Sequence, residues 1–184
     1  FSAYSLMYFA VLSFLPIFLA ERMGISAGAA AGYTAMAVAA NMIGNLSAGA
    51  LFARGVRPSV SLAVCSLTVG LLGASAFFPG MAGAWVIAFC FVFSAVAGLM
   101  PATILLCAPS SVEKPSLVPL SIGLVMQGNY LGQLLGPFIV AAVVSYAGWS
   151  AAAWPVLVVA CLGALLSARY GLASRARESA PRHG

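Results

Sequence analysis

Five amide side chains lie inside long apolar stretches of this sequence. They are Asn41, Asn45, Gln127, Asn129 and Gln133. An amide both donates and accepts hydrogen bonds, so in apolar surroundings it can bind a polar ligand, hold water or bond to a neighbouring helix. The first two amides are four residues apart, as are the last two, so each of these pairs shares a face if the segment is helical. The spacing therefore indicates recognition by hydrogen bonding.

Residues for other kinds of chemistry are scarce. The 184 residues include one histidine, His183, and three acids, all glutamate. A serine or cysteine nucleophile needs a nearby base, and a metal site needs several ligands. The cysteines lack the spacing of a metal or redox motif, and we interpret them as small buried hydrophobic residues. We therefore expect a protein that is not an enzyme and has neither metal nor cofactor.

The composition is that of a membrane protein. Hydrophobic residues make up 63% of the chain and charged residues 6%, and the mean hydropathy is +1.08, whereas soluble domains contain roughly 25% charged residues. A spanning helix needs about 20 apolar residues. The sequence predicts an all-α integral membrane protein with six transmembrane helices, at residues 1–20, 28–53, 59–79, 83–108, 117–146 and 150–170. Since the chain begins inside an apolar run with no signal-peptide pattern, we expect a fragment that lacks an upstream part.

The basic residues predict the orientation of these spans, because lysine and arginine mark the cytoplasmic side. With both ends of the chain in the cytoplasm, Arg22 alone among the cations lies outside. The cytoplasmic cations are then Arg54, Arg57, Lys114, Arg169, Arg175, Arg177 and Arg182. We expect the inner (plasma) membrane of a bacterium, with residues 171–184 as a basic cytoplasmic tail. The tail's arginines are few and lack aromatic partners, so we expect no nucleic-acid binding.

One internal match divides the chain in two. "NMIGNLSA" at 41–48 and "NYLGQLLG" at 129–136 share an asparagine, a glycine, an amide and a leucine in the same order. Inverted repeats are common in transporters, and we predict two inverted three-helix repeats, 1–79 and 83–170. Gly128, Gly132 and Gly136 form a stripe that lets another helix approach closely.

These features together resemble the C-terminal six-span half of a major facilitator superfamily transporter. The resemblance covers all six spans, and "GQLLGPF", ending in Pro137 and Phe138, is similar to the family's Gly-x-x-x-Gly-Pro pattern. In the loop "GALFARGVR", Gly49, Arg54 and Arg57 match a family motif, but Ala53 replaces its aspartate and Val56 its second glycine. That departure puts in doubt any gating ion pair that rests on the aspartate.

The resemblance implies secondary active transport of a small molecule by alternating access. The first span of each triplet would line a central cavity, the second would contact the cavity and the other half, and the third would be peripheral. The partners would be the substrate, the lipid bilayer and the missing N-terminal half. A coupling proton would titrate in that half, since no acid lies deep in these spans. A membrane scaffold or sensor that transports nothing stays open as an alternative, and an intramembrane enzyme fits less well.

The individual residues also leave alternatives open. The five amides either face substrate and water or bond one helix to another. Tyr8 either lines the cavity or lies at a membrane interface, where tyrosine is common. Arg54 and Arg57 set the topology first and take part in gating second. Trp85, Trp149 and Trp154 lie near span ends, as interfacial anchors do.

The orientation can be tested by labelling. Single cysteines introduced at Ser59 and Ser174 of a cysteine-free variant are expected to react with an impermeant thiol reagent only from the cytoplasm. One at Gly80 is expected to react only from outside. Labelling from the opposite sides would overturn the assigned orientation.

Overall fold

The structure, a computed structural model, describes residues 1–78, 80 and 83–179, with no side-chain description for Arg22 or residues 175–179. The regular secondary structure of this part of the chain is all helical, and turns and short loops connect the helices. The α-helices are α1 (Ser2–Leu12), α2 (Leu15–Met23), α3 (Ala27–Ala53), α4 (Pro58–Ser75), α5 (Gly83–Ala97), α6 (Leu99–Cys107), α7 (Val118–Ala147) and α8 (Ala153–Ser179). The 3-10 turns are η1 (Pro109–Ser111), η2 (Pro115–Leu117) and η3 (Trp149–Ala152).

Six of the helical stretches are long and apolar enough to cross a membrane. They are Ser2–Glu21, Ala27–Ala53, Pro58–Ser75, Gly83–Cys107, Pro115–Ala147 and Trp149–Ser174. The prediction of an all-helical protein with six such segments is confirmed, and it indicates an integral membrane protein. Two span ends differ by four residues from the prediction: α4 ends at Ser75 and not at residue 79, and the last span runs to Ser174 and not to residue 170. The helix α8 itself continues to Ser179. The last five residues of the predicted tail lie outside the described part.

The first and fourth spans are each broken into two helices. Between α1 and α2 the chain leaves the helix at Ser13 and Phe14, and between α5 and α6 it does so at Gly98. Pro16 and Pro101 follow these breaks. A proline has no N–H for the carbonyl four residues earlier, which here belongs to Leu12 and Ala97. The predicted continuous segments are therefore two pairs of half-helices.

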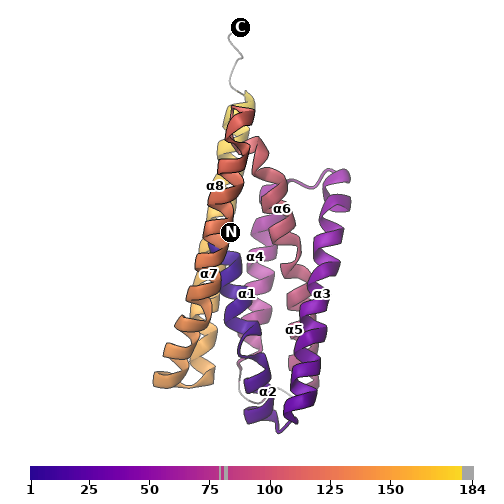
Figure 1. Cartoon of the computed structure of the whole chain (residues 1–184), viewed down its shortest axis with the longest axis vertical. Coiled ribbons are helices and arrows are strands. Elements are labelled where there is room, and N and C mark those ends of the chain that lie inside the picture. Colours follow the sequence, from indigo (N-terminus) through magenta and orange to yellow (C-terminus); the bar gives the residue numbers. More distant parts are fainter. Residues whose placement is uncertain (79, 81–82, 180–184) are drawn as a thin grey trace.

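The helices pack in pairs that are distant in sequence. The contacts join α1 to α7, α3 to α5 and α6, and α4 to α8. In Figure 1, α7 and α8 form one side of the bundle and α3, α5 and α6 the other, with α1 and α4 between them. The first span is thus the most enclosed, since 56% of its residues are buried.

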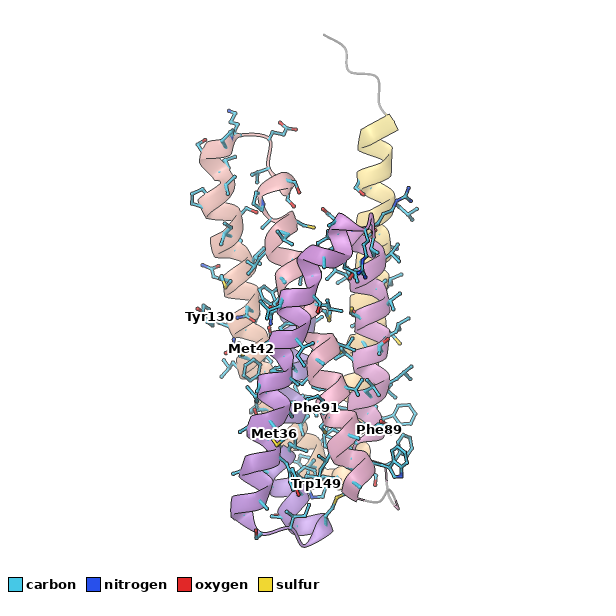
Figure 2. All side chains as sticks on the ribbon, turned by 90° about the vertical axis from the view of Figure 1, so that its right-hand side faces the viewer. Met36, Met42, Phe89, Phe91, Tyr130 and Trp149 are labelled. Atoms are coloured by element: carbon cyan, nitrogen blue, oxygen red, sulfur yellow. The ribbon has the colours of Figure 1, made fainter. Side chains whose placement is uncertain are left out.

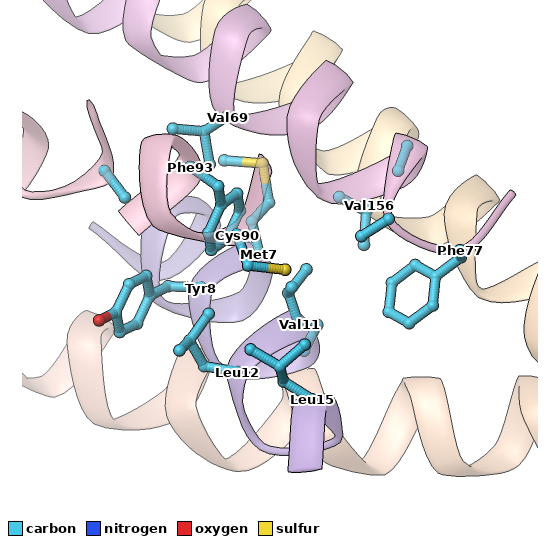
Figure 3. Packing of buried hydrophobic residues seen from close by; sticks show 14 of the residues in the cluster. Met7, Tyr8, Val11, Leu12, Leu15, Val69, Phe77, Cys90, Phe93 and Val156 are labelled. Atoms are coloured by element: carbon cyan, nitrogen blue, oxygen red, sulfur yellow. The ribbon is translucent and has the colours of Figure 1, made fainter. Parts of the chain in front are cut away.

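The core lies where α1, α4 and α5 meet. Met7 and Val11 of α1, Val69 of α4 and Phe93 of α5 are almost completely inaccessible, and Figure 3 shows their side chains converging. In lipid, helices gain little by removing apolar surface from their surroundings, so this tight fit stabilises the bundle mainly through van der Waals contact.

The least covered helices are the second spans and not the third. In the apolar 18-residue window of each span, only 22% of the residues are buried for α3 and 17% for the span containing α7, compared with 44% for α4 and 28% for the span containing α8. In Figure 2, Met36 and Met42 of α3 and Tyr130 of α7 lie on the outside of the bundle. We had expected the third spans to be peripheral, but α4 is covered by α1, α5, α6 and α8.

The described basic side chains gather at one end of the bundle, where Glu113 also lies. Arg54 and Arg57 join α3 to α4, Lys114 precedes α7, and Arg169 lies in the second half of α8. All belong to the end at which α8 finishes, whereas Glu21 lies at the other end, beside α2 (Figure 1). Lysine and arginine are typical of the cytoplasmic side, so the orientation with this end in the cytoplasm stays a prediction.

Two glycines test how closely the helices approach. A Cβ on Gly44 of α3 would lie 2.7 Å from the backbone nitrogen of Leu99, whereas one on Gly123 of α7 meets nothing within 4 Å. Gly44→Ala should therefore destabilise the protein by about 1–3 kcal/mol. Gly123→Ala, the matched control, should leave stability unchanged or raise it by up to about 1 kcal/mol. Thermal unfolding in detergent measures both, and equal effects of the two changes would contradict the packing.

Candidate substrate-contacting site

The glycine stripe of α7 lies directly on the backbone of α1. A Cβ on Gly132 would be 2.8 Å from the Cβ of Ser5 and 2.9 Å from the nitrogen of Leu6, and one on Gly136 would be 3.1 Å from the nitrogen of Ala10. Gly128, one turn earlier, faces the Ser2 hydroxyl at 3.0 Å. The two helices run in the same direction along this contact, and side chains on these glycines would force them apart.

Asn129 lies beside this stripe and is bonded to α1. The hydroxyl of the fully buried Ser5 donates a hydrogen bond to Asn129 Oδ1. Asn129 is itself half-buried. One of the five candidate amides therefore joins two helices through its oxygen, which is the structural alternative described above. Its NH₂ group has no partner within the described part of the chain.

Asn41 has a similar role between α3 and α5. Its Nδ2 donates to the backbone carbonyl of Ser94 at 3.1 Å. Asn45, one turn later and exposed, donates to the Asn41 side-chain oxygen at 2.8 Å and to the Asn41 carbonyl at 3.1 Å. Asn41 thus binds α3 to α5, and Asn45 keeps only its own side-chain oxygen for another partner.

Tyr8 lies inside the bundle. It is 7% exposed, its hydroxyl is 3.1 Å from Ser94 Oγ, and its ring stacks on Phe93 at a centroid distance of 5.9 Å. Tyr4 stacks on its other side, 5.7 Å away. In this structure the side chain is a core residue that connects α1 to α5, and Figure 3 shows it with the other buried hydrophobic residues.

Gln127 and Gln133 are the two amides whose side chains make no hydrogen bond at all within the described part of the chain. Gln127 is exposed and Gln133 half-buried, and neither side chain bonds to another described residue. Gln133 lies next to the middle of α7. Pro137 follows it by four residues inside the helix and cannot donate to the Gln133 carbonyl. The middle of α7 therefore presents a free amide beside a backbone carbonyl without its helical partner.

The loop residues Gly49, Arg54 and Arg57 form no cluster with the amides. Gly49 and both arginines are exposed. Arg54 is the residue directly after α3, and Arg57 is the residue directly before α4. Gly55, between them, takes the left-handed conformation at φ 81°. The positive φ explains why a glycine is needed at this tight turn.

The sequence analysis missed the serines that complete these contacts. Ser5 and Ser94 are fully buried partners of amides or of Tyr8. Another buried serine, Ser66, has no hydrogen-bond partner in the described part, and it lines a cavity of about 180 Å³ together with Tyr4 and Met100. Serine is common in membrane helices, and nothing near Ser5 or Ser94 in sequence indicates that these two bond across helices.

Comparisons with known proteins give no further assignment. The chain matches no protein-family model, no curated protein and no solved structure. The function must therefore be argued from the residues themselves.

The two kinds of residue on α7 can be separated by mutation. Gly132→Leu should prevent the close contact with α1 and lower the yield of folded protein, whereas Gly123→Leu, on an open face of the same helix, should not. Gln133→Leu and its sequence mate Asn45→Leu should preserve the yield, because neither residue joins two helices, and should weaken substrate binding. Yield after detergent extraction and substrate affinity are the measurements. A loss of yield in both amide variants with unchanged affinity would make the amides structural.

Proposed function

We propose that this chain is half of a secondary active transporter of the major facilitator type, which moves a small polar molecule by alternating access. The observation that carries the proposal is the position of the free amides. Gln127 and Gln133 are accessible on α7, the least covered of the spans, although they lie well inside an apolar helix. Gln133 shares its helix face with Asn129, whereas Gln127 lies about 120° away around the helix. The face of Asn129 and Gln133 therefore needs a polar neighbour.

A lipid environment does not fit that face. Polar side chains at membrane depth are unfavourable in contact with hydrocarbon and normally face the interior of a bundle or a watery cavity. Apart from its amides, α7 also exposes apolar side chains, with Leu134 70% and Phe138 71% exposed, but the exposed face of α8, with Leu162, Leu165 and Leu166, carries no amide at all. We infer that α8 faces lipid, while the amide face of α7 borders a cavity shared with the missing half.

The contacts support the proposed inverted repeat. Asn41 and Asn129, matched by sequence, each bond to the first span of the other triplet, at Ser94 and Ser5. Their glycine mates behave alike, since Gly44 lies against α5 and α6 and Gly132 against α1. In both pairs the helices run in the same direction. Equivalent residues making equivalent contacts are expected of two copies of one three-helix unit.

The surface of α3 that no other helix covers supports the proposal that a second helical unit is the partner of this chain. Gly28 and Gly32 are four residues apart on one face, and a Cβ on either would meet nothing within 4 Å. Such a pair is typical of a site where another membrane helix approaches closely. The N-terminal half of the complete transporter is the partner that we propose for α3 and α7.

A membrane scaffold or sensor is the second candidate. It would use the same packing contacts, but it needs no water-filled path. A transporter should expose the middle of α7 to water first from one side of the membrane and then from the other, whereas a scaffold or sensor should not. This exposure therefore distinguishes the two functions. The substrate class that the amides favour is a polar molecule recognised by hydrogen bonds.

The test is cysteine accessibility in the complete protein. Gln133→Cys in a cysteine-free background should react with a water-soluble thiol reagent in membrane vesicles, and the substrate that is transported should slow the reaction. Leu162→Cys, the lipid-facing control, should stay unreactive. Flux into proteoliposomes, screened with polar metabolites, identifies the substrate. If Gln133→Cys is as unreactive as the control and no flux is found, the transporter proposal fails.

A further inference from the structure

The end of the bundle opposite Arg54 and Arg57 is held by an aromatic cluster. The indole of Trp149, in η3, lies 5.4 Å from the ring of Phe18 and 6.1 Å from that of Phe14, both edge-on, and stacks on Phe77 at 6.3 Å. Phe18 and Phe77 also contact each other at 5.7 Å. These four rings come from three separate parts of the chain: α2 and the residue before it, the residues just after α4, and η3.

The cluster joins two groups of helices that otherwise have separate partners. At this end α2 packs mainly on α3, whereas η3 packs on α7 and α8. Figure 1 shows the turn between α7 and α8 on one side of the lower end and α2 with the start of α3 on the other. Trp149 reaches between them, because Gly148 before it takes φ 77° and turns the chain back toward the bundle.

The segment held by these rings is connected to its neighbours by hinges. On one side is the break between α1 and α2, where Pro16 removes a helical hydrogen bond. On the other, Gly24 ends α2 in the left-handed conformation, at φ 63°. A short helix between a proline break and a glycine turn can move as one unit about these two points, and its buried side chains Leu15, Phe18 and Leu19 would move with it.

A single hydrogen bond adds to the ring contacts. Trp149 Nε1 donates to Glu21 Oε2 at 3.3 Å, at an exposed position near the end of α2. A bond of this length in contact with water contributes little. Trp149 is half-buried, whereas Trp85 and Trp154 are 61% and 69% exposed. The predicted anchor role thus fits the two exposed tryptophans better than Trp149.

We propose that Phe14, Phe18, Phe77 and Trp149 form an aromatic clasp that holds the hinged segment α2 against the turn between α7 and α8, and that opening of this clasp is a conformational switch of the bundle. Ring packing provides the attraction and Glu21 orients the indole. The switch belongs to this chain alone and does not depend on the transport function. In a transporter it would control opening at this end.

The test measures the distance across the clasp. Spin labels at Ile17 of α2 and Tyr146 of α7, both exposed, are introduced as cysteines in the cysteine-free protein. The intact clasp should give one narrow distance distribution. Trp149→Ala removes three ring contacts and should raise the population with a longer distance at least about tenfold. Trp149→Phe and Glu21→Gln, which keep ring packing or the hydrogen-bond acceptor, should change it little.

Two further variants keep the test decisive. Trp154→Ala, the matched control in α8, should leave the distribution unchanged because that side chain touches no clasp residue. Phe14→Ala removes a half-buried ring and provides the answer if Trp149→Ala does not fold. The proposal is overturned if folded Phe14→Ala or Trp149→Ala protein keeps the narrow distribution, or if Trp154→Ala broadens it equally.

Discussion

The structure depends on close contact between helix backbones at glycine. Inside a membrane, apolar surface gains little by leaving lipid for protein, so association relies on van der Waals contact and hydrogen bonds at short range. Gly132 and Gly136 provide that contact between α7 and α1, and Gly44 and Gly98 provide it between α3 and the fourth span. A third contact joins α4 to α8, where a Cβ on Gly171 would lie 2.5 Å from Ser59 Oγ.

The hydrogen bonds between helices follow from these contacts. A short side chain such as serine reaches a neighbouring helix only where the backbones are close, and this is where Ser5 meets Asn129 and where the Ser94 carbonyl accepts from Asn41. Each bond contributes roughly 0.6 kcal/mol on average in membrane proteins. The larger effect of these bonds is on the register of one helix against the next. A shift of one residue would leave both the amide and its partner without a hydrogen bond among apolar side chains.

Much of this arrangement could be predicted from the sequence, because it depends on local composition. The six apolar stretches correspond to the six candidate spans, two of which are broken into half-helices, and the glycine stripe around Gly132 was recognisable by its spacing. Contacts between distant residues could not be predicted. Nothing near Asn41 in sequence indicates that the Ser94 carbonyl accepts its hydrogen bond, or that Trp149 packs between phenylalanines. The end of α8 was misplaced because arginine, alanine and glutamate favour helix even after the apolar run ends.

The same competition for partners explains why the free amides are on α7. In α3, Asn45 finds Asn41 one turn earlier and closes onto it. In α7, the corresponding oxygen of Asn129 already accepts from Ser5, and Gln133 stays unpaired beside a carbonyl that Pro137 cannot reach. Two segments with one sequence pattern therefore differ in what they leave available. If the proposed cavity exists, its hydrogen bonds to substrate come first from α7, with α3 contributing the single free oxygen of Asn45.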